Sequence, residues 1–332
     1  MASSARLTSD RDNKALLEVD DLRVFYYTRK GPVKAVDGVS FALEKGDSLG
    51  IAGESGCGKS TTVLAMMRLI PRSGKIVSGG VFFDGVDLTK LTEEEFRKNH
   101  RWKKIAMVFQ GSMNVLNPVF KVGDQIGEAI MLHKGVEKNV ARARVREVLT
   151  LVGIDPSRAD HYPHELSGGM KQRIVIAMAL ACDPDLVIAD EPTTALDVLV
   201  QAQILKLIKN LRKTLNLSMI LVSHDPSLIA DICNRVAIMY AGKIVEIGGV
   251  VDVFTNPSHP YTQGLTRAIP SIAGEKKSLV SIPGQPPDLL VPPTGCRFHP
   301  RCPYAFDLCR RKDPSLTKLD NHYAACHLIS GG

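Results

Sequence analysis

Residues 53–60 read Gly53-Glu54-Ser55-Gly56-Cys57-Gly58-Lys59-Ser60 and fit the pattern G-x-x-x-x-G-K-[ST]. The apolar segment Ser48–Ala52 precedes this stretch, and a segment with helical spacing, Thr61–Ile70, follows it. Glycines in such a loop let backbone N–H groups curl around phosphates, and the helix that follows presents its N-terminus to their negative charge. In this pattern Lys59 reaches the β- and γ-phosphates and the Ser60 hydroxyl ligates magnesium. The stretch therefore predicts a nucleoside triphosphate site between a strand and a helix.

Polar residues follow three further apolar segments, in a fixed order along the chain. Gln110 follows Met107–Phe109, the pair Asp190-Glu191 follows Leu186–Ala189, and His224 comes shortly after Met219–Val222. Short apolar runs bounded by turn signals suit strands that are buried on both faces of a parallel sheet. Two carboxylates at the end of a buried strand are costly unless a cation lies near, and Mg²⁺–ATP would supply that cation. We therefore expect Asp190 to be a direct or indirect magnesium partner and Glu191 to polarise the attacking water as general base.

The segment Leu166-Ser167-Gly168-Gly169-Met170-Lys171-Gln172 lies between Gln110 and the Asp190-Glu191 pair. It opens a helical pattern that runs towards Ala181. One interpretation is a plain helix cap, in which Ser167 satisfies free N–H groups. The other is a second helix N-terminus that is presented to a phosphate. These residues by themselves fit both interpretations.

The full order of these features resembles ATP-binding cassette (ABC) ATPases over about residues 17–250. The resemblance implies ATP and Mg²⁺ as ligands, with Ser60, Gln110 and Asp190 at the magnesium ion. It implies that His224 contacts the γ-phosphate and holds Glu191, and that Gln110 contacts magnesium and water. Tyr26 would stack on adenine, with Phe25 and Tyr27 as competitors. The expected ATP-binding residues are Tyr26, Gly53, Glu54, Ser55, Gly56, Cys57, Gly58, Lys59, Ser60, Thr61 and Asp190. In the family the segment at 166–172 completes the site of a facing subunit, so Ser167, Gly168, Gly169 and Asp197 are expected to contact ATP in trans.

Bulk composition restricts the class of protein. The chain has 332 residues and a net charge of +7 with scattered basic residues, a pattern too diffuse to predict nucleic-acid binding. No stretch approaches the ~20 apolar residues that span a bilayer, and residues 1–14 lack the apolar core of a signal peptide. We therefore expect a cytosolic location with unpaired cysteines, for a protein that either works in solution or relies on partners for its membrane segments.

The pattern along the chain predicts an α/β fold with a mostly parallel core sheet, because strands alternate with helices around the phosphate-binding loop. Residues 15–50 predict antiparallel strands, and residues 236–247 predict a hairpin that turns at Ala241-Gly242. The expected divisions are a disordered tail at 1–14, a nucleotide-binding domain at 15–254 with a helical subdomain at about 92–180, and a small Cys/Pro-rich extension at 255–332.

Ten of the nineteen prolines lie between Pro257 and Pro303, and the extension holds four of the seven cysteines, Cys296, Cys302, Cys309 and Cys326. Four thiols in a small unit with few apolar residues favour a metal over disulfides. The spacing lacks the paired C-x₂₋₄-C of zinc sites and suits a [4Fe–4S] cluster, which takes four thiolates. Zinc, with His299, His322 or His327 as substitute ligands, and an unmetallated unit remain alternatives. Cys57, at a helix N-terminus, is either a reactive thiol or a small residue where serine would also fit.

Further phrases resemble the ATP-binding subunits of dipeptide and oligopeptide importers, of the D type found in dipeptide permeases. They are Tyr162–Leu166, Asp197-Val198 with Gln201–Gln203, His259–Leu265 and Cys296–Pro303. The resemblance implies an ATPase at the cytoplasmic face of the membrane that powers peptide import by ATP-driven dimerisation. It also implies two permease subunits, a second, paralogous ATPase and an extracytoplasmic binding protein as partners, and some such ATPases carry a [4Fe–4S] cluster. The alternatives are an ATPase subunit of the same kind that powers the import of nickel or another small solute, and a soluble non-transport ABC ATPase.

Overall fold

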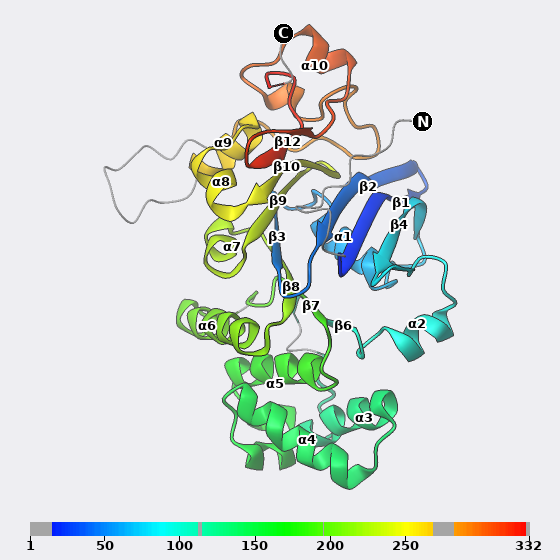
Figure 1. The fold of residues 1–332 in the computed structure, drawn as a ribbon, viewed down its shortest axis with the longest axis vertical. Helices are drawn as coiled ribbons and strands as arrows, with labels where there is room; N and C mark the ends of the chain where they lie inside the picture. The colour runs from blue at the N-terminus through cyan, green and yellow to red at the C-terminus, as the bar shows by residue number, and fades with distance from the viewer. Residues whose placement is uncertain (1–14, 112–114, 195, 268–281, 330–332) are drawn as a thin grey trace. The chain divides into compact units, whose positions relative to one another are not determined.

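The structure is a computed structural model that describes residues 15–111, 115–194, 196–267 and 282–329. The tail predicted at residues 1–14 lies outside these ranges. The chain divides into two compact units, one formed by Met1–Thr89 with Val222–Gly332 and the other by Lys90–Leu221. The first unit therefore joins the blue N-terminal strands and the yellow to red C-terminal elements of Figure 1. Strand β8 (Ser218–Ser223) contains the division between the units.

An antiparallel sheet of order β2-β1-β4-β5 forms the N-terminal part of the first unit. Its strands are β1 (Leu17–Thr28), β2 (Gly31–Leu43), β4 (Gly74–Phe83) and β5 (Val86–Asp87). In β1 the apolar residues Leu17, Val19, Leu22 and Val24 are buried, so that one face of the strand packs into the core. The predicted antiparallel subdomain is confirmed.

A second group of strands in the first unit has the order β11-β12-β10-β9-β3. Its members are β3 (Ser48–Ala52), β9 (Arg235–Tyr240), β10 (Lys243–Gly249), β11 (Thr317–Lys318) and β12 (His322–Ala324). Strand β3 is buried throughout and pairs in parallel with β9, whereas β10, β12 and β11 pair antiparallel. The predicted β9–β10 hairpin turns at Ala241 and Gly242, which both have positive φ.

The helices of the first unit are short. They are α1 (Lys59–Met66), α7 (Pro226–Ile232), α8 (Val250–Thr255), α9 (Pro260–Arg267) and α10 (Asp307–Arg311). The prediction that the helix after the phosphate-binding loop continues to Ile70 is wrong. It ends at Met66, and Arg68 has a φ of 54°, a left-handed conformation that a helix cannot contain.

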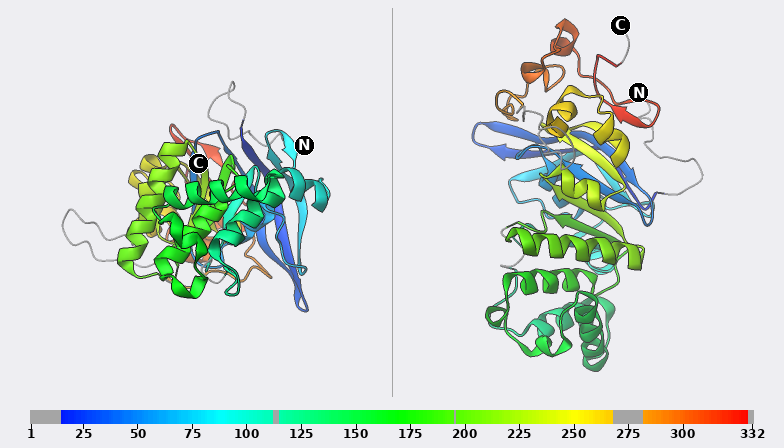
Figure 2. Two further views of the ribbon diagram at one scale, coloured as in Figure 1. Left: turned by 90° about the horizontal axis from the view of Figure 1, so that it is seen from below. Right: turned by 90° about the vertical axis from the view of Figure 1, so that its left-hand side faces the viewer.

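The second unit combines a parallel strand pair with a group of helices. Strands β6 (Ile105–Val108) and β7 (Leu186–Asp190) are buried and pair in parallel. Helices α3, α4 and α5 pack against one another, as the green helices in Figure 2 show. The helices are α2 (Glu93–Asn99), α3 (Val122–Lys134), α4 (Lys138–Leu151), α5 (Gly168–Leu180) and α6 (Val198–Leu215). The mixed α/β class is confirmed.

Candidate functional site

The loop Gly53–Ser60 connects β3 to α1 and is closed around Lys59. The Lys59 side chain is buried, and its Nζ donates hydrogen bonds to the carbonyl oxygens of Gly53 at 2.7 Å and of Glu54 at 3.0 Å. Gly58 precedes α1 with a φ of 107°, and a Cβ there would lie 2.3 Å from the Ala35 carbonyl oxygen. The sequence needs glycine at this point because neither the backbone angle nor the space admits a side chain. The loop therefore curves tightly around the Lys59 ammonium group.

Cys57 lies inside this loop, and its thiol is shielded from solvent. Only 4 % of the residue is exposed, and a Cβ on Gly53 would lie 2.8 Å from its Sγ atom. Burial raises the pKa of the Cys57 thiol and outweighs the opposing effect of Lys59. Of the two interpretations left open above, the structure favours a small packing residue over a reactive thiol.

In the second unit, Gln110 and Glu191 are brought together. The Gln110 Nε2 atom donates to Glu191 Oε2 at 2.9 Å, and the Thr194 hydroxyl donates to the same oxygen at 3.2 Å. Glu191 directly follows β7 and has a φ of 44°, a strained conformation for a residue with a side chain. The preceding Asp190 ends β7 and is 4 % exposed. A buried strand thus delivers two adjacent carboxylates, one of which is oriented by a glutamine.

The segment at 166–172 forms the start of α5. The exposed Ser167 is the N-cap, and its hydroxyl accepts a hydrogen bond from the Met170 N–H at 3.3 Å. Asp197 caps α6 in the same way through the Val200 N–H at 2.9 Å. The two helix starts are close, because a Cβ on Gly169 would lie 2.8 Å from Val200 Cγ1. The capping interpretation is satisfied, and it leaves Ser167 and Asp197 exposed at two adjacent helix N-termini.

His224 and Tyr26 lie in the first unit. His224 is exposed between β8 and Asp225, the N-cap of α7. Tyr26 is part of β1, and its hydroxyl lies 3.4 Å from the Thr61 hydroxyl of α1. This contact joins Tyr26 to the helix that follows the phosphate-binding loop, whereas its neighbour Tyr27 is 50 % exposed.

The four C-terminal cysteines line one small cavity, together with His259, Phe298, His299 and His327. None of the four is in a disulfide. Burial raises the pKa of the Cys296 thiol to about 12, and it also raises the pKa values of Cys302 and Cys326. Within the described residues, however, no group of three or more His, Cys, Asp or Glu side chains has the geometry to hold a metal ion.

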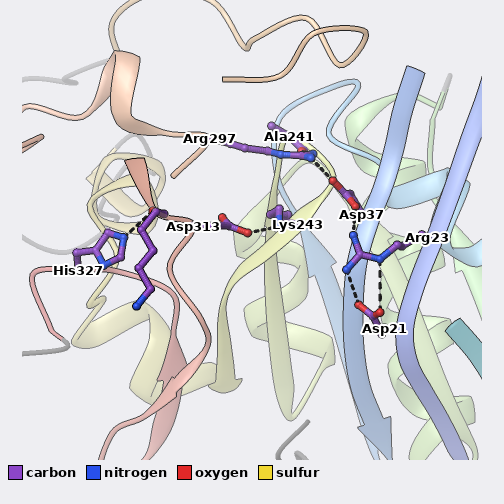
Figure 3. Close-up of polar contacts among 9 residues, drawn as sticks. Asp21, Arg23, Asp37, Ala241, Lys243, Arg297, Asp313 and His327 are labelled. Atoms are coloured by element: carbon purple, nitrogen blue, oxygen red, sulfur yellow. Dashed lines mark hydrogen bonds and ion pairs between the residues drawn. The ribbon is translucent and has the colours of Figure 1, made fainter. Parts of the chain in front are cut away.

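The three histidines considered as substitute ligands have other partners. His322 Nε2 lies 2.9 Å from Glu246 Oε1 and 3.0 Å from the Ser258 hydroxyl. His299 Nδ1 lies 2.9 Å from the Cys296 carbonyl oxygen. His327, which Figure 3 labels, has its Nε2 atom 2.8 Å from the Lys312 carbonyl oxygen. Each histidine therefore has a structural hydrogen bond.

Sequence reasoning missed two arginines and a tyrosine near the loop. Arg301 forms an ion pair with Glu54, Tyr261 accepts a hydrogen bond from the Glu54 N–H, and Arg297 pairs with Asp37. Arg297 and Arg301 lie on either side of Phe298 in the segment Cys296–Pro303. The sequence pattern therefore included both arginines but could not indicate which residues they pair with. Those partners lie more than 200 residues away along the chain, and the sequence carried no signal for the pairing.

Comparison with known proteins gives two family matches. Residues 36–194 match the ABC transporter family, and residues 245–309 match the C-terminal region of oligopeptide/dipeptide transporters. None of the helices in the described ranges is both long enough and apolar enough to cross a membrane.

Curated relatives match over nearly the whole chain. The dipeptide transport ATP-binding protein DppD of Bacillus subtilis is 49 % identical over 317 residues, which cover 94 % of each chain. The oligopeptide transport ATP-binding protein OppD of the same organism is 48 % identical over 320 residues, 95 % of this chain and 89 % of that protein. A dimeric structure of the ATP-binding cassette MJ0796 bound to ADP and Pi has a TM-score of 0.62 and 28 % identity, and it covers 70 % of this chain and 98 % of its own. The chain therefore belongs to the ATP-binding proteins of the dipeptide/oligopeptide ABC transporter family.

Proposed function

We propose that this chain hydrolyses ATP to power the import of di- and oligopeptides through a membrane transporter. The observation that carries the proposal is the match to dipeptide and oligopeptide transport ATP-binding proteins over more than nine-tenths of the chain, including the C-terminal region. Its partners would be two permease subunits, a paralogous ATPase and an extracytoplasmic binding protein, and it would act at the cytoplasmic face of the membrane. We also propose the division into a nucleotide-binding domain at 15–254 and an extension at 255–332.

The ATP site is proposed to use the residues predicted from the sequence. Lys59 and the glycines of the loop would bind the phosphates, Tyr26 the adenine, and His224 the γ-phosphate. Ser60, Gln110 and Asp190 are proposed as the magnesium ligands, because hydroxyl, amide and carboxylate oxygens are the usual protein ligands of this ion. Magnesium, when bound, would neutralise charge on the phosphates. Ser167, Gly168, Gly169 and Asp197 would contact the ATP of the paired subunit.

Glu191 is proposed as the general base for the attacking water. The hydrogen bonds from Gln110 and Thr194 support this role, because they fix the position of the carboxylate that would accept the proton. Glu191→Gln should reduce ATP turnover by about 100-fold or more and leave an ATP-stabilised dimer on size-exclusion chromatography. Glu128→Gln, the same change at an exposed position of α3, is the matched control. Normal hydrolysis by Glu191→Gln would overturn the assignment.

A groove in the second unit is the proposed docking site for a permease helix. Its volume is about 470 Å³. Residues from α3, α4 and the turn at 156–160 line it: Gly123, Asp124, Arg142, Val145, Arg146, Pro156, Ser157, Ala159 and Asp160. A concave surface with both charged and apolar residues suits the end of a helix that emerges from a membrane.

The four cysteines are proposed to hold a [4Fe–4S] cluster. Two observations support this: the thiols share one cavity, and none forms a disulfide. A single zinc ion draws four sulfurs to within about 2.3 Å of one point, an arrangement that the described residues do not show. A four-iron cluster spaces its thiolates more widely, because each binds a different iron. When bound, the cluster would supply the positive charge that stabilises four partly or fully buried thiolates.

Anaerobic purification of the full chain tests this cluster. We expect iron and acid-labile sulfide in equal amounts, lost together in Cys302→Ser and Cys309→Ser and retained in the control Cys182→Ser. Stoichiometric zinc without sulfide would contradict the proposal.

Stimulation of ATPase activity by peptide rather than by nickel, in the complex with both permeases, would separate the peptide importer from the nickel alternative. Full activity without permeases would favour a soluble ATPase.

A further inference from the structure

Arg301, in the cysteine-bearing segment, binds the phosphate-binding loop directly. Its guanidinium donates two hydrogen bonds to the Glu54 carboxylate, from Nη1 to Oε2 at 2.7 Å and from Nη2 to Oε1 at 3.0 Å. The arginine side chain is 6 % exposed and that of Glu54 is 27 % exposed. A bidentate arginine–carboxylate pair fixes orientation as well as distance. Because Glu54 is the second residue of the loop, the pair restrains the loop from outside.

Arg301 is itself held by several further contacts. Its Nε donates to the Pro283 carbonyl oxygen at 2.8 Å, and Nη1 also reaches the Tyr240 hydroxyl at 3.3 Å. The guanidinium lies 5.7 Å from the centre of the Tyr240 ring. The hydrogen bonds to Glu54 raise the pKa of Arg301, so that it stays charged. The arginine is therefore preorganised to hold Glu54.

Tyr261 binds the backbone of the same loop residue. It is fully buried in α9, and its hydroxyl oxygen accepts a hydrogen bond from the Glu54 N–H at 2.9 Å. Its ring packs against Tyr240, with centroids 4.6 Å apart, and against Phe298 at 5.5 Å. Phe298 also lines the cysteine cavity. One aromatic cluster thus joins the cavity to the start of the loop.

Arg297 makes a second connection, to the other side of the loop. It donates to the Ala241 carbonyl oxygen and to Asp37, as Figure 3 shows. The next residue, Gly242, donates its N–H to the Cys57 carbonyl oxygen at 2.8 Å. Asp37 is in turn paired with Arg23 of β1 (Figure 3). The segment from Cys296 to Cys302 therefore supports the loop at Glu54 through one arginine and, through the hairpin turn, near Cys57 through the other.

We propose that Arg301 and Tyr261 are positioning residues for ATP binding, which hold Glu54 so that the phosphate-binding loop keeps its nucleotide-ready form. They act through Glu54 and do not themselves contact the phosphates. The proposal rests on the ATP site and is independent of the transported solute and of any metal at the cysteines. It gives the C-terminal extension a direct influence on nucleotide affinity.

Equilibrium binding of Mg-ATP to the full chain, together with steady-state ATPase kinetics, tests the proposal. Arg301→Gln should raise the Kd and the KM for ATP about tenfold, within the usual range of coupling between sites. Tyr261→Phe removes one acceptor and should raise both about fivefold. In both variants kcat should change by less than about twofold, because an interaction that only positions the loop for binding alters KM more than kcat. Arg311→Gln is the matched control, since its ion pair with Asp307 is exposed.

Two further comparisons separate this role from general stability. Arg301→Lys keeps the charge without the bidentate geometry and should give an intermediate Kd. If Arg301 acts through Glu54, the double variant that carries both Glu54→Gln and Arg301→Gln should bind ATP no more weakly than the single variant Glu54→Gln. The proposal would be overturned if the losses of ATP affinity caused by Glu54→Gln and Arg301→Gln add fully in the double variant. An unchanged Kd in a folded Arg301→Gln or Tyr261→Phe protein would also overturn it. If the Arg301→Gln protein does not fold, the Kd of Tyr261→Phe decides whether the proposal holds, because this variant removes a single oxygen atom and should still fold.

Discussion

At the scale of single residues, the phosphate-binding loop contains three glycines with positive φ, and two of them, Gly58 and Gly56, have very different surroundings. Gly58, with a φ of 107°, would place a Cβ 2.3 Å from the Ala35 carbonyl oxygen, whereas Gly56, with a φ of 78°, has nothing within 4 Å. Gly58→Ala should therefore abolish ATP binding, because the loop must move to relieve the clash. Gly56→Ala should cost only the ~1–2 kcal/mol of a left-handed backbone and retain binding. Fluorescent ATP-analogue titration measures both, and equal effects would contradict this explanation.

A pH effect is expected at His133, which stacks on Trp102 with ring centroids 5.9 Å apart. Burial and, next, the nearby Lys103, Arg97 and Arg101 lower the pKa of His133 below 6.5. The unfolded chain then binds the proton more readily than the folded protein. Stability therefore rises with pH through this window and is lost as pH falls below 6.5.

The single tryptophan of the chain reports this titration. Protonated imidazole quenches indole fluorescence, so Trp102 emission should fall with a midpoint below pH 6.5. His133→Asn should remove the transition and flatten the dependence of unfolding free energy on pH. A midpoint above 6.5 would show that His133 is stabilised in its charged form.

At the scale of elements, the sequence predicted whether a segment is a helix or a strand better than it predicted where that segment ends. The buried strands before Gln110, Asp190 and His224 and the turn at Ala241-Gly242 follow from local apolar runs and turn residues, and these are confirmed. The helix after the loop ends at Met66 although the apolar pattern continues, because Arg68 adopts a left-handed backbone conformation. The contacts of Arg301 and Tyr261 with Glu54 depend on tertiary folding, and no local pattern contains them.

The N-terminus of helix α2 allows the contribution of a helix cap to stability to be tested. Thr92 and Glu95 form a capping box, in which the Glu95 N–H donates to the Thr92 hydroxyl at 3.2 Å and the Thr92 N–H to the Glu95 carboxylate at 2.7 Å. Thr92→Ala should lower the free energy of unfolding by about 1 kcal/mol. Thr92→Ser keeps the oxygen and should leave the free energy nearly unchanged. Urea titration followed by circular dichroism measures both variants, and equal losses would show that the cap is not the cause.

At the scale of the whole molecule, the two compact units contain different candidate sites. The first unit contains the phosphate-binding loop and the cysteine-bearing extension that holds it. The second contains the exposed helix N-termini at Ser167 and Asp197 and the groove on α3 and α4. ATP binding by the isolated chain and its response to a permease should therefore be separable by mutation.

The groove provides the variants that make this separation. Arg142 and Arg146 lie one turn apart on α4 and line the groove. Replacing both with Glu reverses its charge, so it should abolish stimulation of ATPase activity by the permeases and leave the Kd for ATP of the isolated chain unchanged. Lys138→Glu, an exposed charge reversal on the same helix outside the groove lining, should preserve stimulation. A double variant that is still stimulated would place the permease contact elsewhere, whereas a changed Kd would show that the groove and the phosphate-binding loop are energetically coupled.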